Sequence, residues 1–257
     1  MALLVAGVLA LGAQGLWGRL ARVPGAQASA RAVALAPGEA AAWLLLGGLR
    51  AVVIAATWVE LMQAYHAGAF HEVPPLASVI TALDPLREEA WVIGGWTMAV
   101  QIPERHGDPR RAWPWIRQGL LHLQRGLERN PGSWRLPYET AMLLLLHVVA
   151  DRERARALEA DRALDPQGLP AVLLALRHLE RAARVPAHPA APDWARLGLL
   201  LELAAGAPEP GARRGYLDRA AAVLAHLRAD HPYLPEQAFA PWERRLAELE
   251  RKGGSAR

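Results

Sequence analysis

Few residues of this chain stand in a pattern that could do chemistry. His66, His71 and Glu72 lie close together in HAGAFHE, but the histidines are not spaced i, i+4, the interval that puts two imidazoles on one helix face around zinc. The chain has no cysteine, which excludes disulfides, thiolate catalysis and cysteine-ligated zinc. It also lacks GxSxG, a phosphate-binding loop and a dinucleotide fingerprint. We therefore predict a non-enzymatic protein with no catalytic residue, cofactor, metal site or small-molecule substrate.

The stretch QIPERHGDPRRAWPW, residues 101–115, has the composition of a recognition surface. Tryptophan and arginine are the residues most enriched at the energetic centres of protein interfaces. The two tryptophans also fit the core of a following helix, so both interpretations stay open for them. We predict that this stretch binds other proteins, through Arg105, Arg110, Arg111, Trp113 and Trp115.

The composition predicts an all-α protein. With 257 residues and 53% hydrophobic side chains, the chain can bury a sizeable core. Alanine, leucine, arginine and glutamate, which favour helices, dominate, whereas isoleucine, threonine, phenylalanine and tyrosine are scarce. The formal net charge is only +4, and no clustered basic face accompanies it. We therefore predict no nucleic-acid partner.

The amino end predicts a membrane anchor. Residues 2–18 carry no charge, and a helix of that length spans about 25 Å, close to the thickness of a bilayer core. Two alternatives remain: a signal peptide cleaved after ASA at 28–30, which would release a soluble periplasmic binding module, and a buried soluble helix. Arginines follow the span and none precedes it, which favours a cytoplasmic body, whereas the signal-like start favours a periplasmic one. The side of the membrane stays open.

A second apolar stretch, residues 40–58, is also long enough to span a bilayer. Arg50 lies at its middle, where a charge costs about 3 kcal/mol on insertion scales. We therefore expect a buried or membrane-skimming helix of the protein body there.

One sequence frame recurs three times. It reads W-x2-L-M-x2-Y from Trp58 to Tyr65, W-x2-G-G-x2-M from Trp91, and W-x2-L-G-x2-L from Trp194. Prolines at 85, 131, 186 and 232 follow such units. Recurrence of this kind is typical of a protein built from repeated structural units.

The frame resembles the tetratricopeptide repeat (TPR), a helix pair with a W-x2-L-G-x2-Y first helix and a closing proline. The resemblance implies a helical-hairpin solenoid with an N-terminal apolar helix. It also implies that Gly95 and Gly198 lie where the first helix of a pair crosses the second, opposite small residues such as Gly119, Gly126 and Ala220. On a narrower level, EEAWVIGGWTMAVQI and GLERNPGSWRL are similar to uncharacterised, N-terminally anchored bacterial TPR proteins. That group implies anchoring and architecture without an activity.

The spacing departs from the family in one respect. Each later unit is longer than a TPR, and we expect the excess between the two helices of each pair, at 101–111, 151–168 and 205–215, along one edge of the solenoid. We predict an anchor at 1–20, a linker at 21–38, TPR-like repeats at 39–235 and a capping helix with a polar tail at 236–257. Together these features predict a membrane-anchored scaffold or adaptor in a bacterial membrane or envelope complex. An enzyme of unrecognised type is the third alternative.

Overall fold

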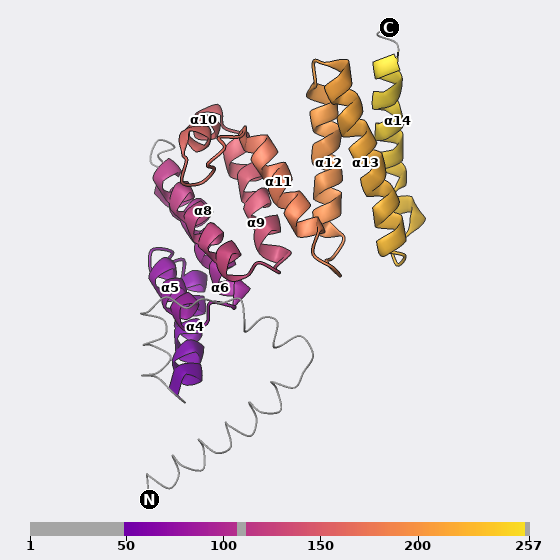
Figure 1. The fold of residues 1–257 in the computed structure, drawn as a ribbon. Helices are drawn as coiled ribbons and strands as arrows, with labels where there is room; N and C mark the ends of the chain where they lie inside the picture. Colours follow the sequence, from indigo (N-terminus) through magenta and orange to yellow (C-terminus); the bar gives the residue numbers. More distant parts are fainter. Residues whose placement is uncertain (1–48, 107–111, 255–257) are drawn as a thin grey trace, which may run out of the picture. The chain divides into compact units, whose positions relative to one another are not determined.

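The computed structural model describes residues 49–106 and 112–254 (Figure 1). Every regular element in these residues is a helix and none is a strand, so the predicted all-α class is confirmed. The chain divides into two compact units, Met1–Pro131 and Gly132–Arg257. The predicted anchor at 2–18, the linker at 21–38, Arg110 and Arg111 lie outside the described residues. Among the helices that are described, none combines the length and apolar character needed to cross a membrane.

Helices of the first unit pack in chain order. Helix α5 (Val73–Leu83) contacts α4 (Arg50–Ala67) and α6 (Glu88–Trp96). Both α6 and its π-helical extension contact α8 (Ala112–Arg129). Gly68 ends the first helix in the left-handed conformation, with φ of 70°, and its N–H bonds to carbonyls of the last turn. Arg50 begins that helix and donates from Nε to the Leu83 carbonyl at 2.7 Å. The elements are α4 (Arg50–Ala67), α5 (Val73–Leu83), α6 (Glu88–Trp96), η2 (Thr97–Gln101), α7 (Ile102–His106) and α8 (Ala112–Arg129).

The second unit repeats this order of packing. α9 contacts α11, α11 contacts α12, and α12, α13 and α14 lie side by side (Figure 1). A shared core of leucines, Val223 and Phe239 joins the last three helices. The elements are α9 (Arg135–Leu144), η4 (Leu145–Val149), α10 (Arg152–Ala160), α11 (Ala171–Ala183), α12 (Ala191–Gly206), α13 (Pro210–Asp230), η5 (Glu236–Ala238) and α14 (Ala240–Gly254).

The tryptophans of the repeat frame lie on α4, α6 and α12, and each contacts the hydrophobic core. Trp58 and Tyr65 pack against the core between α4 and α5. The Trp91 indole is buried and donates to the Pro85 carbonyl at 2.9 Å. Trp194 stacks on Trp242 of α14, with ring centroids 5.8 Å apart. Each frame therefore supplies an aromatic anchor for a helix pair.

Glycines allow a close approach of α6 and α8. A Cβ placed on Gly119 would lie 2.4 Å from the Gly95 carbonyl oxygen, and one on Gly95 would lie 2.6 Å from Leu123 Cγ. A Cβ on Gly126 would lie 2.8 Å from the Trp91 ring. Gly95 thus lies at a helix crossing, where the resemblance places it.

Gly198 differs from that expectation. The side-chain atoms nearest to a Cβ at this position belong to Trp242 of α14, at 3.5 Å, which is an ordinary contact distance. The prediction that Gly198 permits a close crossing with α13 was therefore wrong. Alanine would fit there because the adjacent helix presents a flat ring at normal distance instead of a backbone.

The expected long turns are mostly helical. Helix α12 runs to Gly206 and α13 begins at Pro210, so only 207–209 connect them. A proline in the first turn of a helix needs no N–H partner, and the proline-rich 205–215 segment was wrongly predicted as a loop. Segment 151–168 contains α10, whose first N–H groups bond to the Asp151 carboxylate. Segment 101–111 contains α7.

The glycine geometry predicts opposite effects for two alanine substitutions. Gly119→Ala should destabilise the fold by about 1–2 kcal/mol, because overpacking against the Gly95 carbonyl outweighs the helix preference of alanine. Gly198→Ala should stabilise it by up to about 1 kcal/mol, because the helix preference acts without a clash. Urea unfolding followed by circular dichroism measures both, and equal shifts in the same direction would contradict the assigned crossing.

His122 of α8 is buried beside Trp91, with ring centroids 4.7 Å apart. Burial lowers its pKa from 6.5 to about 4; a hydrogen bond to the Ala90 backbone opposes this shift and Arg125 adds to it. The folded chain therefore binds a proton less readily here than the unfolded chain. The stability contributed by neutral His122 is complete above pH 6.5 and is lost as the pH falls toward 4.

We expect unfolding experiments to detect this loss. Over that pH interval the term amounts to as much as about 3 kcal/mol for the wild-type chain. A His122→Leu variant should lose correspondingly less stability as the pH falls, since leucine does not titrate; its lost hydrogen bond to the Ala90 backbone lowers stability at every pH. Urea midpoints measured in steps from pH 7 to about pH 4 test this. Parallel pH profiles for the two proteins would contradict it.

Candidate functional site

The described candidate residues of the predicted recognition stretch lie on α7 and in the first turn of α8. Arg105 lies on α7, where its guanidinium covers the Phe70 ring at 5.0 Å. Trp113 and Trp115 are both half-buried in the first turn of α8, on either side of exposed Pro114. Arg105 therefore has an intramolecular contact, and partner binding by this stretch stays a prediction.

The histidines considered first in the sequence lie around the end of α4. The His71 Nε2 is 3.6 Å from the Glu72 Oε1, and both side chains are largely exposed. His66 makes an edge contact with the Tyr65 ring. These residues contact solvent and their chain neighbours.

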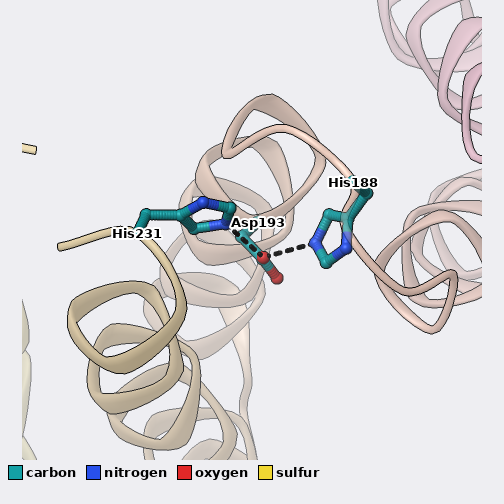
Figure 2. Close-up of side chains that lie close together, drawn as sticks. All are labelled: His188, Asp193 and His231. Carbon is teal, nitrogen blue, oxygen red and sulfur yellow. Dashed lines mark hydrogen bonds and ion pairs between the residues drawn. The ribbon is translucent and has the colours of Figure 1, made fainter. Parts of the chain in front are cut away.

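A different cluster of titratable side chains lies buried in the second unit (Figure 2). His188 stands in the turn between α11 and α12, Asp193 in the first turn of α12, and His231 directly after α13. All three are buried, and Asp193 is completely so. We refer to His188, Asp193 and His231 as the His–Asp–His cluster.

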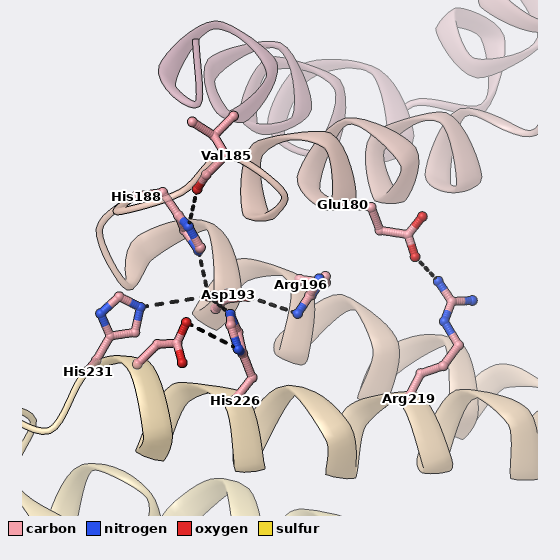
Figure 3. A network of polar contacts seen from close by, with 9 residues as sticks. Glu180, Val185, His188, Asp193, Arg196, Arg219, His226 and His231 are labelled. Carbon is pink, nitrogen blue, oxygen red and sulfur yellow. Dashed lines mark hydrogen bonds and ion pairs between the residues drawn. The ribbon is translucent and has the colours of Figure 1, made fainter. Parts of the chain in front are cut away.

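The Asp193 carboxylate is the centre of this cluster (Figure 3). Its Oδ2 lies 2.8 Å from the His188 Nε2 and 3.8 Å from the Nε2 of both His226 and His231. Its Oδ1 lies 2.9 Å from Arg196 Nη2. Three imidazoles and one guanidinium thus surround a single buried carboxylate.

Each histidine also has a partner on its outer nitrogen. The His188 Nδ1 lies 2.8 Å from the Val185 carbonyl and the His231 Nδ1 lies 3.2 Å from the Tyr233 hydroxyl. The His226 Nδ1 lies 3.5 Å from the Asp230 carboxylate. These contacts fix the ring orientations, so the Nε2 atoms are held toward Asp193.

His188 has a further constraint on its protons. Its Nδ1 faces a carbonyl and its Nε2 faces a carboxylate, and both are acceptors. A neutral imidazole carries one N–H and can therefore donate to only one of these two acceptors. His231 differs from His188, because its buried Nε2 has no hydrogen-bond partner.

The turn that carries His188 is strained. Ala187 has φ of 58°, the one positive φ of a non-glycine residue in the described part of the chain. A left-handed conformation at alanine costs about 1–2 kcal/mol and persists only where the surroundings impose it. The next residue, His188, contacts the Val185 carbonyl and the Asp193 carboxylate, so the strained Ala187 orients the cluster.

A cavity of about 500 Å³ adjoins the cluster. Two of its lining residues, His188 and His231, belong to the cluster itself, and Tyr233 at its edge is 69% exposed. The cavity therefore adjoins the cluster on the side of its two histidines. The lining residues are Trp134, Ala187, His188, Pro189, Asp230, His231 and Tyr233.

Arg196 neutralises part of the buried charge. Burial lowers its pKa from the ordinary value, and the nearby Asp193 carboxylate partly opposes that shift. Since the arginine stays protonated at neutral pH, Asp193 Oδ1 is held in an ion pair. The Oδ2 atom remains as the oxygen that faces the histidines.

Sequence reasoning missed this cluster because no short motif contains it. His188 and Asp193 stand around the start of a helix, and His231 follows the end of the next one. Only the antiparallel pairing of α12 with α13 brings these helix ends together. The chain matches no protein-family model, no curated protein and no solved structure at a significant level. The site is therefore interpreted from its own geometry.

The buried ion pair predicts an asymmetric response to charge removal. Asp193→Asn should lower the free energy of unfolding by about 3 kcal/mol, because Arg196 loses its buried counter-charge. Asp218→Asn is the matched control, since Asp218 is exposed and pairs with Arg214 on one helix face. It should change stability by less than about 0.5 kcal/mol. Equal urea midpoints for the two variants would show that the cluster is not a buried ion-pair network.

Proposed function

We propose that this chain is a non-enzymatic TPR-like scaffold that holds other proteins together in a bacterial membrane or envelope complex. The observation that carries the proposal is the order of helix packing. In each unit, described helices pack against the next helix of the chain or, past the short α7 and α10, against the one after it, as in repeat proteins whose units bury a core only by stacking. Solenoids of this kind offer extended surfaces for binding proteins.

The crossing of α6 and α8 supports a TPR-like hairpin. Gly95 and Gly119 bring the two backbones into contact there, at positions where the repeat carries small residues. Trp91 anchors the same hairpin through its bond to the Pro85 carbonyl. Attachment to the membrane through residues 2–18 is part of the proposal and rests on the sequence alone.

The partner-binding edge is testable by charge reversal. A full-length, tagged chain is extracted in detergent and passed over a size-exclusion column, and its stoichiometric partners are identified. The variant replaces Arg105, Arg110 and Arg111 by Glu. It should reduce the co-eluting partner at least about tenfold, which corresponds to 1.4 kcal/mol of lost binding. Circular dichroism checks that the variant stays folded, since Arg105 also covers the Phe70 ring.

A matched triple variant on α14, with Arg244, Arg251 and Lys252 replaced by Glu, changes the net charge equally and should retain the partner. Loss of the partner in both triples would indicate nonspecific charge attraction instead of a defined edge. A wild-type chain that elutes alone at every salt concentration would overturn the scaffold function itself.

A further inference from the structure

We propose that the His–Asp–His cluster binds a divalent transition-metal ion, with zinc as the best match. His188, Asp193 and His231 each offer one ligand atom, and these atoms lie within 4.8 Å of one another. Around tetrahedral zinc, with bonds of about 2.0–2.1 Å, ligand atoms are roughly 3.3 Å apart. The distances from Asp193 Oδ2 to the two Nε2 atoms, 2.8 and 3.8 Å, lie on either side of that value. Small rotations of the side chains would therefore complete the geometry.

The unpaired nitrogen of His231 is independent support. Its ring is 5% exposed, and its Nε2 points toward Asp193 without a hydrogen-bond partner (Figure 2). A buried polar atom without a partner is costly, so such atoms are rare in folded proteins. A metal ion on this nitrogen supplies the missing partner.

A proton on His188 does not satisfy the whole cluster. An imidazolium at His188 would bond to Val185 and Asp193, but the His231 Nε2 would remain unpaired. A metal ion accepts lone pairs from both histidines and from the carboxylate together. The outer bonds of His188 to a carbonyl and of His231 to the Tyr233 hydroxyl are the kind that orient metal-binding histidines.

The donor set indicates the class of metal. Two imidazoles and one carboxylate suit zinc and neighbouring first-row ions, whereas magnesium and calcium prefer oxygen ligands throughout. Arg196 binds Asp193 Oδ1 and so directs Oδ2 toward the histidines. The Asp230 carboxylate lines the adjoining cavity and adds negative charge. Water from this cavity would fill the fourth coordination position.

Zinc titration of the full chain tests the site. After treatment with a chelator and its removal, calorimetry with zinc chloride should show about one ion bound per wild-type chain. His231→Gln should weaken binding at least about tenfold, while His71→Gln, which changes an exposed histidine of α4–α5, should bind like wild type. Magnesium chloride should produce no stoichiometric binding. Circular dichroism checks that His231→Gln folds, because the substitution gives up the contact of the His231 Nδ1 with the Tyr233 hydroxyl.

X-ray absorption at the zinc edge provides a measurement that needs no variant. The wild-type complex should show only nitrogen and oxygen ligands at about 2.0–2.1 Å, with the scattering pattern of imidazole. Absence of stoichiometric binding to wild type, or equal affinity in His231→Gln, would overturn the metal site. Either result would leave the cluster as a purely structural ion-pair network and would not affect the scaffold function.

Discussion

A buried charge is the constraint on which the second unit depends. The Asp193 carboxylate is completely removed from water, and a buried carboxylate is tolerated only where polar or oppositely charged groups surround it. Those groups come from separate elements: His188 from the α11–α12 turn, Arg196 from α12, and His231 from the end of α13. The register of α12 against α13 is therefore set by electrostatics as well as by the leucine core. The strained φ of Ala187 is one local cost of meeting that requirement.

The first unit reaches close helix packing by a different route. At the crossing of α6 and α8, glycines remove the side chains that would separate the two helices. The nearby titratable group, His122, is accommodated as a neutral ring against Trp91. In the first unit, glycines allow a helix pair to pack closely. In the second unit, contacts of a buried carboxylate contribute to the packing as well. The buried charged residues of the second unit also form a candidate functional site.

The sequence was sufficient where local pattern and composition decide the outcome. Helix-favouring residues predicted the all-α class, and the GG pair in the Trp91 frame predicted the close crossing at Gly95. At Gly198 the same frame gave a wrong prediction, because the nearest side chain is Trp242 of α14. This contact depends on how the C-terminal helix packs. Segment 205–215 was expected between two helices, although Pro210 fits the first turn of α13. The His–Asp–His cluster escaped because its members meet only when two helices are paired.

The cluster and the cavity share His188 and His231, and this has a thermodynamic consequence. A ligand that enters the cavity contacts the same rings that would hold a metal ion. If occupancy of one changes the affinity of the other, the effect is reciprocal and equal in free energy. Tyr233 contacts His231 and also lines the cavity. A metal ion on His188 and His231 would therefore line this cavity as well as link the helix ends of the second unit.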